Sequence, residues 1–161
     1  MAKISKKTKS PRGAGPRRIQ HERPVARVAE VMTREVVTLA QTESFDRAVT
    51  LMANSDFQHC VIVDQAGKVA GVISDRDILR AVARATDWQS KSVANVMTRE
   101  PVTVRAETAL SEAVRKMISR GIHCLPVTDD GGRVEGILTS TDLLNAYQKV
   151  LQPASKRPKR E

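Results

Sequence analysis

Aromatic side chains are scarce in this chain, since phenylalanine, tryptophan and tyrosine make up 2% of its 161 residues. A surface that stacks successive bases of single-stranded nucleic acid needs aromatic platforms, so none is expected here. Cysteine is equally rare, and Cys60 and Cys124 do not form a C-x-x-C pair, which disfavours zinc. No apolar run is long enough for a signal peptide or a membrane span. We therefore expect a cytoplasmic protein with reduced thiols, no metal and no contact with membranes.

The net charge of +9 is concentrated at the two ends of the chain. Residues 1–27 carry nine Lys or Arg side chains against Glu22, and residues 153–161 carry four against Glu161. The first 24 residues are also rich in Pro, Gly and Ser, which predicts a disordered basic tail at 1–24, with a second basic tail at 151–161. Such tails can contact nucleic acid phosphates without sequence preference, or they can act as solubilising segments or bind an acidic protein.

The rest of the chain is one unit written twice. A shift of 65 positions aligns residues 28–80 with 93–145 without a gap, and 18 of the 53 aligned positions are identical. Both copies open with the pattern V-A-x-V-M-T-R-E-x-V-T. A duplication of this kind predicts two copies of one supersecondary unit, each burying the face that the other leaves exposed. We assign repeat one to 25–85, a connector to 86–92 and repeat two to 93–150.

Each repeat shows the same order of local signals. Apolar side chains at i, i+3, i+4, i+7 and i+8 predict an amphipathic helix after a short β run. Its N-cap candidates are Thr42 or Ser44 in repeat one and Thr108 in repeat two. Two β runs joined by a Gly-containing turn predict a hairpin, and a second helix follows. The unit is thus β-α-β-β-α and the fold class α+β, with a polar loop at 86–92. The first strands are expected at 36–39 and 101–104, the hairpin strands at 60–63, 69–73, 124–127 and 134–138.

The end of each hairpin carries the motif G-x-x-S/T-x-x-D, at residues 71–77 and 136–142. At Ser74 or Thr139 the strand passes to a helix N-terminus, where free backbone N–H groups attract an anion such as phosphate. The Asp one turn later can accept two hydrogen bonds from a ribose diol. The same spacing fits a helix capping box, in which the carboxylate returns to the backbone. A nucleotide-binding corner and a plain helix cap both fit the motif.

In combination, these features resemble the CBS-domain family over residues 28–152: the duplicated V-M-T opening, the order of elements, the Asp- and Gly-containing turns and the motif at the hairpin end. The resemblance implies a tandem pair, or Bateman module, whose repeats pack by their sheets around a pseudo-twofold axis and form two clefts. It implies that the clefts bind adenosyl ligands such as AMP, ADP, ATP or S-adenosylmethionine, and that the protein is a homodimer. Members of the family regulate rather than react.

The resemblance also carries site residues over by position. In each copy the Ser or Thr of the motif faces phosphate and the Asp faces ribose, while the opening segment of the opposite repeat completes the cleft. The candidates are Ser74, Asp77, Thr98 and Val102 for one cleft, Thr139, Asp142, Thr33 and Val37 for the other, and Ile62 and Val127 as adenine walls or ordinary core positions.

The two copies differ near these corners. Arg76 can reach a phosphate or remain a solvated helix arginine, whereas its counterpart is Thr141. We therefore expect unequal clefts, with the one at Ser74 tolerating more negative charge. Further differences are the pairs His59/Cys124 and Val61/Pro126.

No set of nucleophile, base and orienting group recurs in the two copies, so catalysis is not indicated. His59 and His123 occupy non-equivalent positions without an acidic or thiol partner at ligand spacing, which disfavours a metal site. The sequence favours a stand-alone regulatory module that binds an adenosyl ligand and changes conformation or assembly. The alternatives are a nucleic-acid-associated accessory protein that binds through its tails, and an interaction module with empty clefts.

Overall fold

A computed structural model describes residues 26–84 and 86–151. The predicted basic tails therefore lie outside the described residues, apart from Leu151. The described chain is mixed helix and sheet in two repeats of strands and helices, which confirms the α+β class and the repeated architecture.

The elements of repeat one begin with a short 3₁₀ turn and end with a ten-residue helix. In order they are η1 (Val28–Glu30), β1 (Thr38–Ala40), α1 (Phe45–Ala53), β2 (His59–Val63), β3 (Val69–Ser74) and α2 (Asp75–Arg84). After the connector turn η2 (Trp88–Ser90), repeat two contains η3 (Val93–Asn95), β4 (Thr98–Arg99), α3 (Leu110–Arg120), β5 (Cys124–Thr128), β6 (Val134–Thr139) and α4 (Ser140–Leu151).

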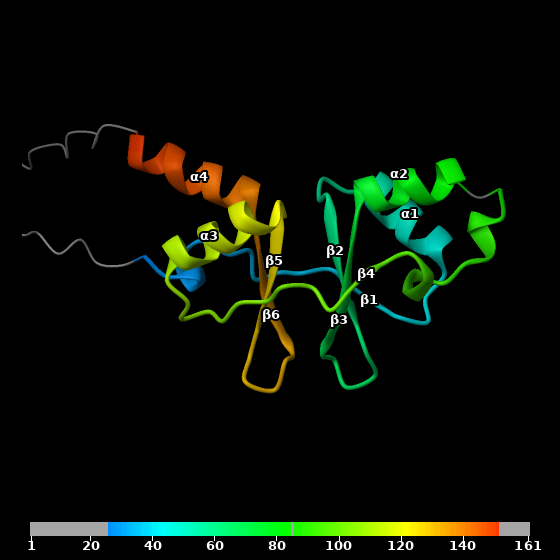
Figure 1. Ribbon diagram of the computed structural model, residues 1–161, viewed down its shortest axis with the longest axis horizontal. Coiled ribbons are helices and arrows are strands. Elements are labelled where there is room, and N and C mark those ends of the chain that lie inside the picture. Colours follow the sequence, from blue (N-terminus) through cyan, green and yellow to red (C-terminus); the bar gives the residue numbers. More distant parts are fainter. Residues whose placement is uncertain (1–25, 85, 152–161) are drawn as a thin grey trace, which may run out of the picture.

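The hairpins β2–β3 and β5–β6 stand next to each other at the centre of the molecule (Figure 1). Helices α1 and α2 lie outside the first hairpin, and α3 and α4 lie outside the second. The protein therefore has two halves, which meet along their sheets and carry their helices on the outer sides.

The two repeats exchange their opening segments. Strand β4 opens repeat two, but it pairs antiparallel with β3 of repeat one and completes a sheet in the order β1-β2-β3-β4. In the same way, Thr33 of repeat one forms an antiparallel bridge with Ile137 of β6. The Thr33 and Ile137 amides donate to each other's carbonyl oxygens, at 2.9 Å in both directions. Each half is thus built from most of one repeat and the first residues of the other.

The two hydrophobic cores follow this exchange. Val93 and Met97 of repeat two are buried against Phe45, Ile62 and Ile73 of repeat one. The second core mirrors the first, because it combines Val28 and Met32 with Val104, Met117, Leu125, Val127 and Leu138. Burial of these large apolar side chains from both repeats, at about 1.5–3 kcal/mol for each, ties the opening segment of each repeat to the core of the other.

Glycine is required where the exchanged segments pass closest to the hairpins. A Cβ atom on Gly71 would lie 2.5 Å from Met97 Sδ and 2.9 Å from the Thr98 carbonyl oxygen. A Cβ atom on Gly136 would lie 2.8 Å from Met32 Sδ and 2.9 Å from the Thr33 carbonyl oxygen. The glycine of the motif G-x-x-S/T-x-x-D thus makes room for the opening segment of the other repeat.

The first strand of each repeat differs from its prediction. Strand β1 runs over Thr38–Ala40 instead of 36–39, and the run predicted at 101–104 is reduced to a parallel bridge between Val104 and Val127. Val61 of β2, which pairs with β1, has Pro126 of β5 as its counterpart, and Pro126 has no backbone N–H to donate to a first strand, which explains why the second copy is shorter.

The predicted caps hold only in repeat one. Ser44 is the N-cap of α1, where its Oγ accepts a hydrogen bond from the Arg47 amide at 3.2 Å. Thr108 does not cap α3, so that prediction is wrong. Ala109 occupies the N-cap position, and the Thr108 hydroxyl accepts from the Arg105 amide instead, within the turn before the helix.

The connector is more ordered than the loop predicted at 86–92, since it contains η2. The Trp88 ring packs edge-on against Phe45, with 6.0 Å between the ring centroids and 87° between the planes. The connector is thereby fixed to the core of the first half. Among the helices of residues 26–84 and 86–151, none has the length and apolar character needed to cross a membrane.

Candidate functional site: two clefts between the repeats

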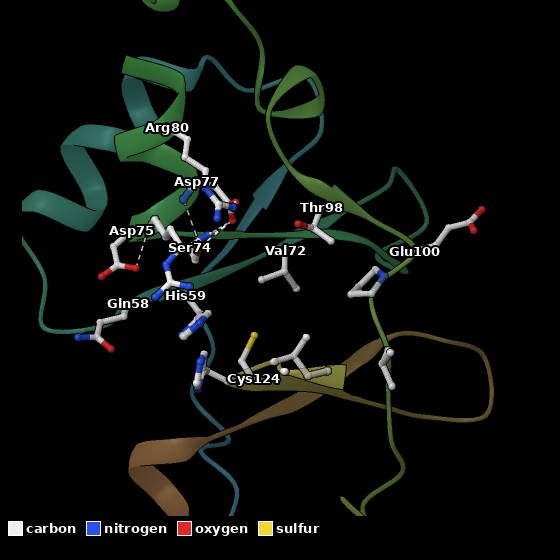
Figure 2. Close-up of a pocket in the computed structure, with 16 residues that line it drawn as sticks. Gln58, His59, Val72, Ser74, Asp75, Asp77, Arg80, Thr98, Glu100 and Cys124 are labelled. Carbon is white, nitrogen blue, oxygen red and sulfur yellow. Dashed lines mark hydrogen bonds and ion pairs between the residues drawn. The ribbon is translucent and has the colours of Figure 1, made fainter. Parts of the chain in front are cut away.

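Cleft A is a cavity of about 450 Å³ at the end of β3. It is lined by Ser74 and Asp77 at the corner of β3 and α2, by Thr98 of the neighbouring strand β4, and by Val102 and Cys124 of repeat two. Figure 2 shows Thr98 beside Val72 and Cys124 across the cleft from them. Arg76 also lines this cavity. All the residues that the sequence assigned to this cleft are therefore brought together.

Cleft B is the corresponding cavity of about 500 Å³ at the end of β6. It is lined by Thr139 and Asp142 from repeat two and by Thr33 and Val37 from the opening segment of repeat one. The volumes of both clefts fall within the range usual for small-molecule sites. The sequence thus anticipated the polar residues and the cross-repeat partners in both cavities.

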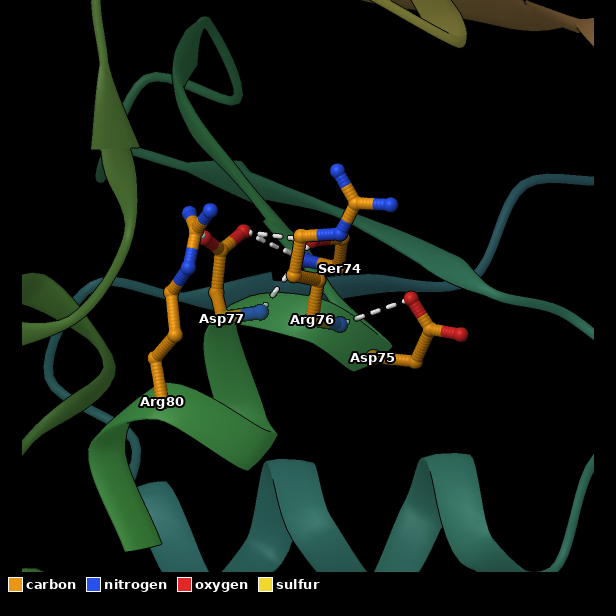
Figure 3. Close-up of polar contacts among 5 residues, drawn as sticks. All are labelled: Ser74, Asp75, Arg76, Asp77 and Arg80. Carbon is orange, nitrogen blue, oxygen red and sulfur yellow. Dashed lines mark hydrogen bonds and ion pairs between the residues drawn. The ribbon is translucent and has the colours of Figure 1, made fainter. Parts of the chain in front are cut away.

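The corner of cleft A is a capping box (Figure 3). The Asp77 Oδ2 atom accepts from the Ser74 amide at 2.9 Å and from the Ser74 hydroxyl at 2.6 Å. The Ser74 Oγ accepts in turn from the Asp77 amide at 3.3 Å. Thr139 and Asp142 repeat the arrangement in cleft B, with distances of 2.7, 2.6 and 3.2 Å. The helix-cap interpretation of the motif is therefore correct for both copies.

The cap uses one carboxylate oxygen and leaves the other with a different partner in each cleft. In cleft A, Asp77 Oδ1 lies 3.9 Å from Arg80 Nη1, and the Asp77 side chain is 20% exposed. In cleft B, Asp142 Oδ1 accepts a hydrogen bond from the Thr33 hydroxyl at 3.0 Å. A helix cap and a ligand contact can coexist on Asp77, because its second oxygen remains accessible as an acceptor.

The predicted adenine walls are wrong. Ile62 and Val127 are fully buried in the two cores and line neither cleft A nor cleft B. Successive side chains of a strand point to opposite faces, so Ile62 faces the helices together with Ile73. The apolar walls are instead Val72 of β3 in cleft A and Ile137 of β6 in cleft B, which lie on the sheet faces between the two halves.

Three residues that sequence reasoning did not assign line both clefts: Gln58, His59 and His123. Burial lowers the pKa of His59, an effect that the nearby charge of Asp75 opposes and that of His123 reinforces. His123 Nδ1 lies 3.4 Å from Ser140 Oγ at the start of α4. The histidines occupy non-equivalent positions in the repeats, so a comparison of the copies gave no signal that they meet at the boundary between the cavities.

Neither cysteine has the character of a nucleophile. Burial raises the pKa of Cys60 to about 11, and burial together with the charge of Asp77 raises the pKa of Cys124 to about 12. A reactive cysteine needs a lowered pKa, because the thiolate is the attacking species. Both thiols are free, and Cys124 forms part of the wall of cleft A.

A protein-family model for the CBS domain matches the chain twice, at residues 28–84 and 93–149. The matched segments are the two copies of the duplicated unit, and they end with the helices that follow Ser74 and Thr139. The chain belongs to the CBS-domain family and contains two CBS domains in tandem.

Solved structures of CBS pairs share the fold of the whole described chain. The CBS domain pair of protein MJ0100, in complex with 5′-methylthioadenosine and S-adenosyl-L-methionine, is 28% identical with a TM-score of 0.72, covering 79% of this chain and 99% of that one. CBSX2, a CBS-pair protein from Arabidopsis thaliana, was solved in complex with AMP. It is 27% identical with a TM-score of 0.70, and the match covers 78% of this chain and 98% of that one.

A curated relative of greater length is homoserine O-acetyltransferase from Methanosphaera stadtmanae. It is 34% identical over 124 residues, which cover 77% of this chain and 24% of that protein. The chain thus spans about a quarter of the length of this relative.

Proposed function

We propose that this protein is a regulatory module that binds adenosyl ligands, such as AMP, ADP, ATP or S-adenosylmethionine, in clefts A and B, and that binding changes its conformation or assembly. The module is not itself an enzyme in this proposal, because its buried thiols are poor nucleophiles and its carboxylates Asp77 and Asp142 are engaged in helix caps. The two free thiols also agree with a location in the cytoplasm.

The observation that carries the proposal is the construction of each cleft from both repeats. Cleft A is lined by the capped corner Ser74–Asp77 together with Thr98 and Val102 of the other repeat, and an equivalent set lines cleft B. Two relatives of the same fold were solved with AMP or with two adenosyl compounds. A ligand that contacts both sides of a cleft favours whichever arrangement of the halves closes on it, which is a shift of population.

The test is a thermal-shift screen of AMP, ADP, ATP, S-adenosylmethionine and NADH. A ligand that binds only the folded protein raises the melting temperature by mass action. The informative variants are Asp77→Asn and Asp142→Asn, because the amide oxygen can still accept from the Ser74 or Thr139 amide. The NH₂ group then takes the place of the carboxylate oxygen that accepts from the ligand.

We expect each single variant to reduce the shift and the double variant Asp77→Asn/Asp142→Asn to abolish it. The matched control is Asp64→Asn, in the β2–β3 turn, where Oδ1 accepts from the Ala66 and Lys68 amides away from both clefts. An undiminished shift in the double variant would refute binding at these corners. The absence of a shift with any of the compounds would favour an interaction module with empty clefts.

The proposed assembly is a homodimer formed through the outer helices. Leu79 of α2 and Leu144 of α4 occupy equivalent positions in the two repeats and are 70% and 67% exposed. Tyr147 is also 61% exposed on α4. Because the duplication places the same apolar residue on both helices, a second copy can cover them with one self-complementary interface. Sedimentation should give the mass of a dimer for the wild type and the mass of a monomer for Leu79→Glu/Leu144→Glu. A monomer mass for both proteins would refute the homodimer.

A further inference from the structure

We propose that cleft A continues into a cationic pocket that binds the polyphosphate chain of a nucleoside di- or triphosphate, whereas cleft B prefers adenosyl ligands that carry no phosphate chain. This inference rests on the proposed function and assigns a different ligand preference to each cleft. It starts from a third cavity of about 670 Å³ between α2 and the segment that leads into β4.

The third cavity adjoins cleft A. Asp77 and Arg80 line both cavities, so a ligand whose ribose is held at Asp77 can extend past Arg80 into the third one. In Figure 3, Arg76 and Arg80 extend on either side of the Asp77 carboxylate. We name the cavity the cationic pocket, and its lining residues are Asp77, Arg80, Ala81, Arg84, Ser90, Lys91, Asn95 and Val96.

The charges of the cationic pocket are largely uncompensated. Arg80 is 3.9 Å from Asp77, and Lys91 is 3.8 Å from an Asp87 carboxylate that is 72% exposed, so both contacts are long and weak. Arg84 takes part in none of the ion pairs formed within residues 26–84 and 86–151. Three cations therefore face a single carboxylate, Asp77, whose Oδ2 atom is already used by the helix cap.

The duplication supplies an internal comparison, because each of these positions has a counterpart 65 residues away. Arg80 corresponds to Asn145 and Arg84 to Lys149, while Lys91 and Asn95 correspond to Ala26 and Glu30. The second half thus has one cation and an added carboxylate where the first has three cations. The excess of cations at these positions is therefore confined to the first half.

The charges that line the two clefts also differ, again with more cations in the first. Each cleft is lined by three carboxylates, which are Asp75, Asp77 and Glu100 in cleft A and Glu35, Asp56 and Asp142 in cleft B, but only cleft A adds cations, Arg76 and Arg80. In cleft B no Lys or Arg of the lining offsets the carboxylates, so they repel a phosphate chain and attract a cationic substituent such as a sulfonium or an amine. Arginine binds phosphate oxygens in pairs through its guanidinium fork, and a concave cationic wall raises the local concentration of an anion.

The experiment is calorimetric titration in the Asp142→Asn background, where cleft B is disabled, with 5′-methylthioadenosine, AMP and ATP and no added divalent cation. We expect ATP to bind more tightly than AMP, and the preference to shrink as salt screens the charges. Adding Arg84→Gln and Lys91→Gln should weaken ATP binding by about tenfold, which is about 1.4 kcal/mol shared between two partly exposed ion pairs. Binding of 5′-methylthioadenosine should change by less than about twofold, because neither residue lines cleft A.

The matched control is Lys149→Gln, which removes the counterpart of Arg84 in α4 and should leave ATP binding unchanged. Equal affinity for AMP and ATP, or an ATP preference that survives Arg84→Gln/Lys91→Gln, overturns the cationic pocket and leaves the proposed function standing. No binding of any of the three compounds overturns both. If the variant loses binding of 5′-methylthioadenosine as well as ATP, Arg84 and Lys91 maintain the structure of cleft A as a whole. That result would contradict a separate phosphate subsite.

Discussion

Replacing Gly71 with alanine tests the exchange of opening segments most directly. The added methyl group would lie 2.5 Å from Met97 Sδ and 2.9 Å from both Met97 Cγ and the Thr98 carbonyl oxygen. Met97 is 7% exposed and packed in the first core, so it has little room to move, and the Thr98 oxygen belongs to the backbone of β4. We therefore expect β4 to move away from β3, which relieves the clash with the added methyl group.

The loss of folding stability in Gly71→Ala is the difference between two opposing effects. Overpacking of a tight contact costs about 1–3 kcal/mol, while the loss of glycine's freedom in the unfolded chain returns about 0.4–1 kcal/mol. The net loss of stability is about 1–2 kcal/mol, or roughly 3–10 °C in melting temperature for a body of this size. The control Gly131→Ala lies in a turn where the nearest atom to a new Cβ is the Asp129 carboxylate at 3.3 Å, so it should shift the melting temperature far less.

The displacement should also be specific to one cleft. Thr98 lines cleft A, so Gly71→Ala should weaken ligand binding in cleft A, whereas Gly136→Ala should act on cleft B by moving Thr33 away from Asp142. Thermal denaturation and calorimetric titration of the two variants measure both effects. If Gly71→Ala is as stable as the wild type, the predicted clash does not occur. If either variant weakens ligand binding equally in both clefts, the effect of each glycine is not specific to one cleft.

Three further predictions concern single side chains. Burial lowers the pKa of His59 below its ordinary value of 6.5, so the unfolded chain binds this proton more readily and stability should fall as the pH drops through 6.5. Denaturation of His59→Gln from pH 8 to 5 should show a smaller fall than wild type, and parallel curves would contradict this. Because the pKa of Cys124 is raised to about 12, on the order of one thiol in 10,000 is ionised at pH 8. Ellman's reagent should therefore label Cys124 slowly, and more slowly still with ATP in cleft A, and a lack of protection by ATP would argue against its occupancy there. Trp88→Ala removes the edge-on contact with Phe45 and should cost about 1–3 kcal/mol, measured by urea denaturation, whereas an unchanged midpoint would mean that the connector is not fixed to the core.

The sequence predicted the repeated architecture because its signals are local and appear twice. The apolar stripe of the helix Phe45–Ala53 depends on neighbouring residues alone. The same holds for the hairpin turns that end at Gly67 and Gly132, whose φ angles are 76° and 82°. The capping geometry of Ser74 and Asp77 is equally local. Such features can be identified without knowledge of what packs against them.

The features that sequence reasoning missed depend on contacts between distant segments. Ile62 and Val72 are both apolar strand residues, and only the register of β2 against β3 decides which of them faces a core and which a cleft. The meeting of His59 with His123, and the approach of Lys91 to Arg84, depend on how the halves and the connector pack. The contrast between Arg80 and Asn145 was visible in the aligned copies, but its significance required the position of the cavity.

The exchange of opening segments also determines how the two halves are joined. Residues 38–99 form one half, and residues 28–33 together with 104–151 form the other, so the backbone crosses between them twice, at 34–37 and 100–103. Glu35, Val36 and Val37 of the first crossing line cleft B, and Glu100, Pro101 and Val102 of the second line cleft A. Glu100 already has a left-handed backbone, with φ of 48°, a conformation that costs a non-glycine residue energy. Within the described residues, these two crossings join the halves, and each cleft is built on one of them. Its occupant therefore touches the short stretch of backbone through which any rotation of one half against the other has to be transmitted.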